Sequence, residues 1–384
     1  MNYKKLPDIC NITTGKLDAN AAVAGGAYPF FTCAPEPITI DSFAFDCDAV
    51  LLAGNNAQGN FHITRYNGKF NAYQRTYVIT AKDGYNIDFI KYMLELSLAH
   101  FKSQAQGSQT KFLTIQILNS FSIPDISLDE QIKTVGPLVV LDKKINNNNN
   151  ACAELETMAK ALYDYWFVQF DFPNENGKPY RTSGGAMEWC QELGREVPKG
   201  WKVRRLPEVS SVQYGFPLST EQFSSTGNRV VRIRDIIDNS YSALTNEAVG
   251  NEYFTQEGDL LVGMDGNFQM NYWTRSGDIV NQRITRIRKT VIPIMLIKMQ
   301  IQPYITAKID TVARSTVGHL GDADFSERFI LVPEGLDIKV FDAYLSRIVS
   351  LRKESQELSD LRDWLLPMLM NGQAHIEVGG DEPV

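Results

Sequence analysis

The feature that most constrains the fold is a long internal repeat. The segment Lys4 to Ile9 reappears as Arg204 to Val209, a shift of 200 positions. Three further matches follow in the same order at shifts of 207 to 209, namely Gly59-Asn60-Phe61 with Gly266-Asn267-Phe268, Gln74-Arg75 with Gln282-Arg283, and Ile123-Pro124 with Val332-Pro333. Four ordered matches with a slowly drifting offset indicate a unit of roughly 200 residues that occurs twice.

Each copy ends in a stretch whose apolar residues lie three and four positions apart, the pattern of a seam between long packed helices. The expected seam residues are Ile145, Asn148, Leu155 and Leu162 in the first copy and Ile348, Leu351, Ser355, Leu358 and Leu365 in the second. Each seam carries one polar residue, Asn148 or Ser355, which is a common device for fixing register. The pattern favours a coiled coil over the alternative of two separate core helices.

The first helix has a clear start and an uncertain middle. Ser127 and Glu130 form a capping box, which places the start near residue 127. Gly136-Pro137 is expected to kink or break the helix, and Asn146 to Asn150 has poor helix propensity.

Before each helix lies a body of about 125 residues with short β-type runs between Gly, Asn and Pro. The clearest runs are Ala49 to Ala53, Tyr77 to Thr80, Val230 to Ile233, Asp259 to Val262 and Ile284 to Ile287. The sequence therefore predicts mixed α/β bodies, and an α+β protein when their helices are included.

Composition limits the cellular setting. The net charge is −7 and the five cysteines show no C-x-x-C spacing. The longest apolar run, Val291 to Ile297, is far shorter than the roughly 18 residues of a membrane helix. We expect a protein of the cytoplasm with no membrane partner, and the N-terminus lacks the apolar core of a signal peptide.

Several motifs that resemble catalytic sites are incomplete. Gly54 to Gly59 has the glycine spacing of a phosphate-binding loop, but Asn60-Phe61 stands where Lys and Ser or Thr are needed. Pro124-Asp125 with Glu130 and Lys133 has the wrong spacing for a nuclease metal cluster, and the four histidines do not pair with cysteines as zinc ligands do. The chain is predicted to bind no cofactor or metal and to be no enzyme by itself.

Two segments carry a resemblance to a known family. They are Ala161-Leu162-Tyr163-Asp164-Tyr165-Trp166-Phe167-Val168-Gln169-Phe170-Asp171-Phe172-Pro173, continuing through Asn176-Gly177-Lys178-Pro179-Tyr180 to Val197-Pro198-Lys199-Gly200-Trp201, and Leu361 to Gln373 near the C-terminus. Both resemble segments of the specificity subunits of type I restriction-modification systems. Ile123-Pro124 leading into Leu128 to Gln131 is similar to the family's junction between a recognition domain and its helix.

The resemblance implies a complete architecture. Two target-recognition domains each read one half of a split double-stranded DNA sequence, and two long helices pair antiparallel in a pseudo-two-fold arrangement to set the distance between the halves. The implied divisions are domain 1 at 1–126, the first helix at 127–170, a connector at 171–203, domain 2 at 204–336, the second helix at 337–373 and a tail at 374–384.

The resemblance also implies partners. Subunits that methylate adenine N6 would hold S-adenosylmethionine, and ATP-dependent subunits that translocate and cut DNA would hold ATP and magnesium. The expected docking surfaces are the outer faces of the helices and the 163–201 connector. Its aromatic residues Tyr163, Tyr165, Trp166, Phe167 and Phe170 form either a core beneath a domain or such a docking site, and the two are compatible.

Side chains that can read base edges are Arg or Lys for guanine, Asn or Gln for adenine, and Asp or Glu for cytosine. The first domain's candidates are Asn55, Asn56, Gln58, Asn60, His62, Arg65, Tyr73, Gln74, Arg75, Gln104, Gln106, Ser108, Gln109 and Lys111. The second domain's candidates are Arg229, Arg232, Arg234, Asp265, Asn267, Gln269, Asn271, Trp273, Gln282, Arg283, Arg314, Ser315, Thr316 and His319. Arg232 and Arg234 are expected on one face of a strand, where they contact phosphates or else pair with Asp235 and Asp238.

Two other functions remain open from the residues alone. The acidic net charge and scattered aromatic residues also fit a non-catalytic scaffold of two modules that bind protein or glycan. A third possibility is the recognition half of a split modification enzyme.

Overall fold

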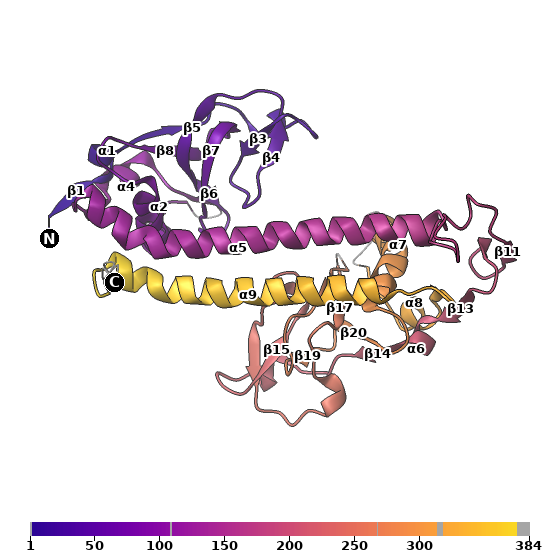
Figure 1. The fold of residues 1–384 in the computed structure, drawn as a ribbon. Coiled ribbons are helices and arrows are strands. Elements are labelled where there is room, and N and C mark those ends of the chain that lie inside the picture. The colour runs from indigo at the N-terminus through magenta and orange to yellow at the C-terminus, as the bar shows by residue number, and fades with distance from the viewer. Residues whose placement is uncertain (1, 108–109, 267, 313–317, 375–384) are drawn as a thin grey trace, which may run out of the picture. The chain divides into compact units, whose positions relative to one another are not determined.

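Two units make up the structure, which is a computed structural model describing residues 2–107, 110–266, 268–312 and 318–374. Unit 1 comprises residues 1–144 and 358–384, and unit 2 comprises residues 145–357. Helices α5 (Leu128–Tyr163) and α9 (Lys339–Met370) each contribute residues to both units (Figure 1).

The body of unit 1 is a six-stranded sheet with short helices. Its strand order is β2-β8-β5-β7-β3-β4. The sheet elements are β2 (Cys10–Thr14), β3 (Tyr28–Phe31), β4 (Ile38–Ile40), β5 (Phe45–Ala53), β7 (Ile63–Ala72) and β8 (Thr76–Ala81). The other elements are β1 (Tyr3–Lys5), α1 (Leu6–Ile9), β6 (Asn55–Asn56), α2 (Ile87–Leu96), α3 (Leu98–Gln104), β9 (Lys111–Phe112), α4 (Ile115–Ser120) and β10 (Ser122–Pro124).

The body of unit 2 repeats this plan with shorter strands. One sheet has the order β14-β20-β17-β18 and a second has the order β16-β15-β19. The first sheet contains β14 (Ser210–Tyr214), β17 (Leu260–Gly263), β18 (Met270–Tyr272) and β20 (Ile284–Lys289), and the second contains β15 (Asn228–Val231), β16 (Ala243–Thr245) and β19 (Ile279–Val280). The remaining elements are β11 (Met187–Cys190), β12 (Arg195–Pro198), β13 (Lys202–Arg205), α6 (Leu206–Val209), α7 (Ile294–Val312), α8 (Ala323–Ser326) and β21 (Phe329–Val332).

The internal repeat of the sequence is a repeat of structure. In each unit a short strand leads directly into a four-residue helix that begins with a buried leucine, Leu6 or Leu206. The carbonyl of that leucine accepts the side chain four residues later, Cys10 Sγ at 3.0 Å in unit 1 and Ser210 Oγ at 2.9 Å in unit 2. The strand order β2-β8-β5-β7 in unit 1 corresponds to β14-β20-β17-β18 in unit 2. The predicted α+β duplication is confirmed.

A glycine at the same place in each unit shows how closely the two backbones correspond. A Cβ on Gly15 would lie 1.8 Å from the carbonyl oxygen of Ala72, and a Cβ on Gly215 would lie 2.0 Å from that of Asn281. Only glycine fits such an approach of two chain segments.

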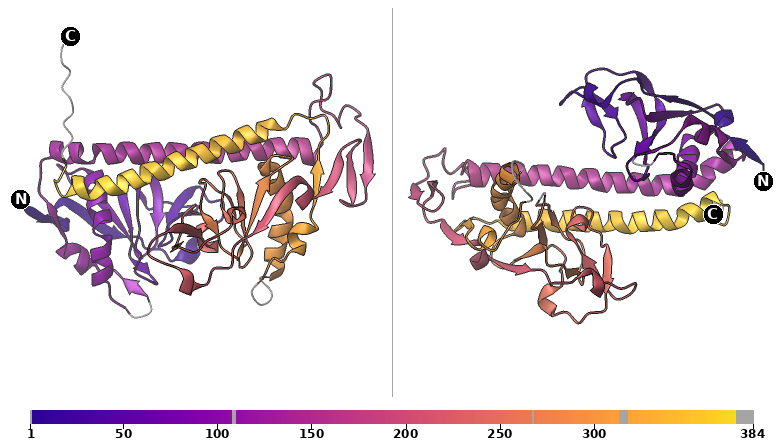
Figure 2. Two further views of the ribbon diagram at one scale, coloured as in Figure 1. Left: turned by 90° about the horizontal axis from the view of Figure 1, so that it is seen from below. Right: turned by 180° about the vertical axis from the view of Figure 1, so that it is seen from behind.

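Helices α5 and α9 run antiparallel in each unit, where they lie side by side (Figures 1 and 2). In unit 1 Arg362 donates to Asp142 at 2.9 Å. In unit 2 Asn148 donates to Glu354 at 2.8 Å. The seam residues Asn148, Ile348 and Leu351 are buried, and the other six expected seam residues are half-buried.

The start of α5 follows the predicted capping box, and of the kink or break predicted at Gly136-Pro137 the break does not occur. The amide of Ser127 donates to Glu130 at 3.0 Å and the amide of Glu130 donates to Ser127 Oγ at 3.3 Å. The Ser127 hydroxyl donates to the Glu130 carboxylate at 2.8 Å, and this bond together with that from the Ser127 amide lowers the pKa of Glu130. The helix continues through Pro137 because its neighbours Val135 and Leu138 are buried in the core of unit 1, which offsets the lost hydrogen bond.

The aromatic residues of the connector belong mainly to the core of unit 2. Tyr163, Phe167 and Phe170 are buried, and the Phe167 and Phe170 rings pack on Trp201 at 5.2 and 5.8 Å between centroids. Tyr165 is exposed and therefore remains available to a partner.

In the part of the chain that the structure describes, none of the helices has the length and apolar character needed to cross a bilayer.

Candidate nucleic-acid interface

A tight turn in unit 1 presents two side chains at the surface. Strands β7 and β8 are joined through Tyr73 to Thr76, and the amide of Thr76 donates to the carbonyl of Tyr73 at 2.8 Å. The central residues Gln74 and Arg75 are exposed, whereas Thr76 is buried. The carbonyl of Arg75 accepts the amide of Gly54 at 2.8 Å. The main chain thus fixes the turn and leaves both side chains free to make other contacts.

A polar loop between β5 and β7 is anchored beside this turn. Its strand β6 pairs with β9, which places Asn56 opposite Lys111. The Asn56 side chain accepts the amides of Gln58 and Asn60 at 2.9 and 3.0 Å, a turn of the type that asparagine favours. Asn60 in turn accepts Lys102 Nζ at 2.7 Å. Asn56 is therefore used to shape the loop, while Gln58 and Asn60 are exposed.

Phe112, together with the candidate residue Gln106, meets the same turn. The Arg75 guanidinium lies 4.8 Å from the centroid of the Phe112 ring. Phe112 is fixed by two main-chain hydrogen bonds with Gln106, of 2.8 and 3.1 Å. Gln74 donates to Asp18 at 3.3 Å. A hollow of about 340 Å³ lies here, and Gly54, Gln74, Arg75 and Phe112 are among the residues that line it.

Unit 2 builds the same turn. The amide of Ile284 donates to the carbonyl of Asn281 at 3.0 Å, and the carbonyl of Arg283 accepts the amide of Met264 at 2.9 Å. Gln282 and Arg283 are exposed between buried Asn281 and buried Ile284. Each contact has its counterpart in unit 1 at a shift of 208 or 210 positions.

The arginine of the second turn lies beside a carboxylate, whereas the arginine of the first turn stacks on an aromatic ring. Asp265 Oδ2 lies 3.4 Å from Arg283 Nε, and Asp265 Oδ1 lies 2.7 Å from Nδ1 of the exposed His319. At the corresponding positions, unit 1 has the uncharged residues Asn55 and Phe112, which pair with each other as Asp265 and His319 do. A larger hollow of about 660 Å³ adjoins this turn, and Asp265, Gln269, Gln282 and Arg283 are among its lining residues.

Comparison with known proteins finds a family likeness for the first part of the chain. A family model described as the type I restriction modification DNA specificity domain matches residues 1–157. The type I restriction enzyme EcoDI specificity subunit of Escherichia coli is 45% identical over 223 residues, which are 54% of this chain and 48% of that one. The first part of the chain is therefore similar to the DNA specificity domain of type I restriction-modification systems.

Other specificity subunits are similar over more of the chain. The MjaIX specificity subunit of Methanocaldococcus jannaschii is 24% identical over 322 residues, covering 78% of this chain and 72% of that one. The crystal structure of the S subunit of a type I system from M. genitalium has the same fold, with a TM-score of 0.55 at 15% identity over 98% of this chain and 96% of that chain. The match to the E. coli specificity subunit spans about half of that protein's length.

Two of the candidate reading residues lie in the interior of unit 2. Trp273 has 0% exposure, and its indole nitrogen donates to Asp278 at 2.9 Å. Asn271 is buried on β18, where its side chain accepts the amide of Tyr272 at 3.0 Å and donates to the carbonyl of Ile237 at 2.8 Å. Neither residue can touch a DNA duplex in this fold, so the expectation that they read bases is corrected.

Asn271 has a structural counterpart in unit 1, Asn71. The buried Asn71 side chain accepts the amide of Ala72 at 3.0 Å and donates to the carbonyl of Ser42 at 3.3 Å. Replacing either asparagine by alanine leaves buried main-chain groups without partners, so we expect a loss of about 1.5 kcal/mol in the free energy of unfolding in both cases. Urea denaturation measures this loss, and a stable Asn271→Ala variant with altered sequence preference would contradict the structural role.

The three arginines near β15 are not arranged as the sequence suggests. The strand ends at Val231, and the next residues turn into a short 3-10 helix, Ile233–Asp235. Arg232 and Arg234 therefore do not share a strand face. Arg234 lies 3.9 Å from Asp235 and keeps 64% of its side chain exposed, and Arg229 stacks over Tyr241 at 5.0 Å. Arg232 lines the hollow beside Arg283.

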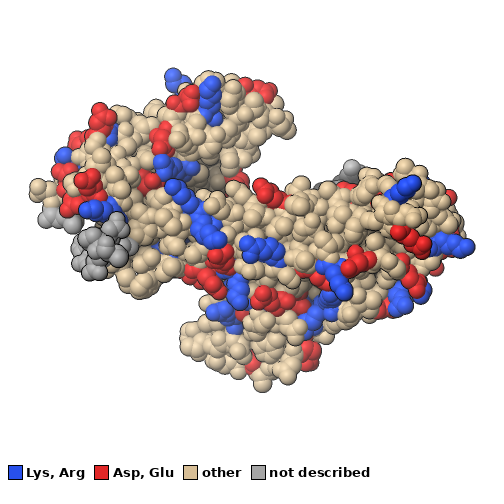
Figure 3. All heavy atoms as spheres, viewed as in Figure 1, with Lys and Arg blue, Asp and Glu red and all other residues tan. Residues whose placement is uncertain are grey.

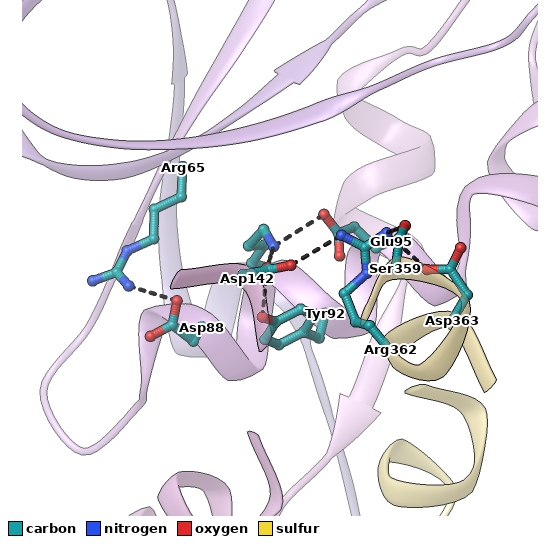
Figure 4. Close-up of polar contacts among 9 residues, drawn as sticks. Arg65, Asp88, Tyr92, Glu95, Asp142, Ser359, Arg362 and Asp363 are labelled. Atoms are coloured by element: carbon teal, nitrogen blue, oxygen red, sulfur yellow. Dashed lines mark hydrogen bonds and ion pairs between the residues drawn. The ribbon is translucent and has the colours of Figure 1, made fainter. Parts of the chain in front are cut away.

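Arg65 is exposed but paired with carboxylates of unit 1, and His62 is half-buried. Arg65 forms ion pairs with Asp48 at 2.7 Å and with Asp88 at 2.5 Å, and the second pair is drawn in Figure 4. Its guanidinium is therefore satisfied by carboxylates of β5 and α2. His62 is half-buried, and burial lowers its pKa. It is neutral at physiological pH, where it carries no charge for a phosphate.

The remaining candidates divide by exposure. Gln104 and Gln106 are exposed, whereas Asn55, Tyr73, Lys111 and Gln269 are half-buried. The candidates outside the described residues are Ser108, Gln109, Asn267, Arg314, Ser315 and Thr316.

In the described part of the chain, no group of three or more His, Cys, Asp or Glu residues is placed to hold a metal ion.

Sequence reasoning missed two residues that support the first turn. Phe112 stacks under Arg75, and Lys102 binds Asn60. The signal for Phe112 was available, because the offset of 207 places it opposite His319, which was a candidate. Lys102 carries no comparable signal, since it reaches the loop from helix α3.

Proposed function

We propose that this chain is the DNA-reading specificity subunit of a type I restriction-modification complex. Each unit would recognise one half of a bipartite duplex target. The observation that supports the proposal most strongly is the exposed Gln-Arg turn that occurs in both units with the same main-chain contacts. Amide and guanidinium side chains make the bidentate contacts that distinguish adenine and guanine in the major groove.

The charge distribution fits a protein that reads sequence through a few local contacts. On the face shown in Figure 3, basic and acidic side chains are interspersed instead of forming one positive field. Residues 1–126 carry as many basic as acidic side chains, so the net charge of −7 does not describe the first recognition body. Binding should still weaken with salt, because any cation that contacts phosphate releases counterions.

The long helices would set the distance between the half-sites and bind the other subunits. Exposed apolar side chains on them, including Val140, Met158 and Trp364, are suited to contacts with partners. The chain would act without catalysis in the cytoplasm. Adenine-N6 methylation subunits would supply S-adenosylmethionine, and ATP-dependent restriction subunits would supply ATP and magnesium.

Selection from a pool of random DNA duplexes tests this function. The purified full-length chain should enrich a motif of two short conserved blocks separated by a spacer without sequence preference, with affinity that falls as salt rises. Indifference to DNA sequence and salt would instead support a scaffold that binds protein or glycan. Methyl transfer to DNA by the chain alone would support a split modification enzyme.

A further inference from the structure

We propose that Arg75 and Arg283 are the residues that specify a guanine, one in each half of the target. The inference rests on the proposed DNA-reading function and makes it specific. It assigns the same chemical role to two residues 208 positions apart and predicts a guanine in both half-sites.

The first support is that the two arginines occupy the same place in the two units. Each arginine follows an exposed glutamine and precedes a buried residue that closes the turn. The carbonyl of each arginine accepts a hydrogen bond from an amide at the end of the neighbouring strand. Main-chain bonds fix both turns, so each guanidinium projects from a rigid position. A rigid position is what base reading requires, because bidentate geometry tolerates little displacement.

The second support is the state of the Arg75 guanidinium. Its contact with Phe112 is a stack, which uses the face of the planar group and leaves its edge unoccupied. Among the described residues of unit 1, none hydrogen-bonds to this side chain or forms an ion pair with it. The edge that carries the paired N–H donors is therefore available for O6 and N7 of guanine.

The third support is that a different contact orients Arg283 and also leaves donors of its guanidinium available for a base. Asp265 approaches it at Nε, 3.4 Å away, and Asp265 is itself fixed by His319 at 2.7 Å. The structure describes no partner for the two terminal nitrogens of Arg283. Because the carboxylate contacts only Nε, the two terminal nitrogens can still donate a pair of hydrogen bonds to guanine. Asp265 is therefore a positioning residue for the guanine contact.

A phosphate contact is the competing role, and the two roles differ in a measurable way. An arginine on phosphate strengthens binding to all sequences alike, whereas one on guanine changes the preference at one base pair. Lysine retains the attraction to phosphate but lacks the planar fork. Because lysine can still contact guanine, the substitution Arg→Gln separates the two roles: glutamine favours adenine over guanine, and it carries no charge for a phosphate.

The experiment is the random-duplex selection repeated with full-length Arg75→Lys, Arg75→Gln, Arg283→Lys and Arg283→Gln variants. Each arginine is exposed, so the variants should retain the wild-type circular dichroism spectrum. We expect the preference for guanine at one position to fall roughly 5- to 150-fold, in one half-site for Arg75→Gln and in the other for Arg283→Gln, and the Lys variants should show a smaller fall at the same position. Lys69→Gln and Lys202→Gln, which remove exposed cations elsewhere in the two units, should leave the motif unchanged.

The outcomes separate this inference from the proposed function. If the wild-type chain selects a bipartite motif and the arginine variants select the same motif with unchanged guanine preference, the guanine assignment is overturned and DNA reading stands. Loss of affinity for all sequences without a change in any base preference would assign the arginines to phosphate. Failure of the wild-type chain to select any motif would overturn both.

Asp265→Asn provides an independent test of positioning. Removing the carboxylate takes a negative charge away from the DNA surface, so affinity for unrelated DNA should rise. The guanine preference in the second half-site should fall by a few fold, because Arg283 is no longer held at Nε. The first half-site should not change. Unaltered guanine preference would show that Asp265 does not orient Arg283.

Discussion

Replacing Asp259 by alanine is expected to lower the free energy of unfolding by about 4 kcal/mol, because it leaves two arginines without their counter-ion in the interior of unit 2. Asp259 is 2% exposed, and its two carboxylate oxygens each accept from Arg288 at 2.7 Å. Arg286, whose side chain is 4% exposed, lies 3.8 Å away. Burial lowers the pKa of Arg286, and the Asp259 charge opposes this effect.

Urea denaturation at neutral pH measures this loss, and Asp238→Ala is the matched control. Asp238 is an exposed carboxylate of the same unit, and its removal should change stability by less than about 0.5 kcal/mol. Because Arg286 and Arg288 lie on β20, which begins directly after the Gln282-Arg283 turn, the Asp259 variant should also lose preference in one half-site. A stability within about 1 kcal/mol of wild type would contradict this account of the buried pair.

Replacing Asp142 by asparagine is expected to cost about 2 kcal/mol through a polar cluster in unit 1. Asp142 on α5 accepts Lys91 Nζ at 2.8 Å and the Tyr92 hydroxyl at 2.7 Å from α2, and Arg362 at 2.9 Å from α9 (Figure 4). The carboxylate therefore ties three helices together. The expected cost is smaller than for Asp259 because the charged side chains Lys91, Asp142 and Arg362 are 13 to 27% exposed.

The effect of Asp142 should depend on pH in a defined direction. Burial alone would raise its pKa, but Lys91 and the hydrogen bonds to Tyr92 and Arg362 hold the pKa below the ordinary 3.8. A depressed pKa stabilises the fold above the unfolded value, and this contribution is lost as the pH falls through the folded value. Wild type and Asp142→Asn should therefore converge in stability as the pH falls below 3.8.

The matched control is Asp83→Asn, which removes an exposed carboxylate of unit 1 and should differ little from wild type at any pH. Burial raises the pKa of Glu95, the other carboxylate beside Lys91, which gives the opposite pH dependence. Glu95 is present in both wild type and Asp142→Asn, so its contribution largely cancels when their free energies of unfolding are subtracted. A difference between wild type and Asp142→Asn that stays constant down to acidic pH would contradict the ionic role.

Local patterns predicted the architecture well where one physical cause dominates. The capping box at Ser127 sets the helix start, because its hydrogen bonds depend only on adjacent residues. The ordered repeat predicted two equivalent bodies, since matching residues at a common offset adopt matching turns. The exposed Gln74-Arg75 and Gln282-Arg283 pairs were found this way.

Other residues depended on tertiary contacts that no local pattern reveals. Asn271 belongs to a residue type that can read bases, yet its side chain forms hydrogen bonds with main-chain groups in the interior of unit 2. The prediction that Arg232 lies on a strand face was wrong, because strand β15 ends at Val231 and the chain turns there. The helix passes through Pro137 because packing on both sides outweighs its local cost.

Sequencing of methylated DNA tests the central claim most directly. Cells expressing this chain together with a methylation subunit that co-purifies with it should be compared with cells that lack only this chain. We expect adenine methylation at one split motif that depends on the chain, and exchange of residues 1–126 for those of a relative should change only one half of that motif. A stable complex that leaves both methylation patterns identical would contradict the claim that this chain reads DNA sequence.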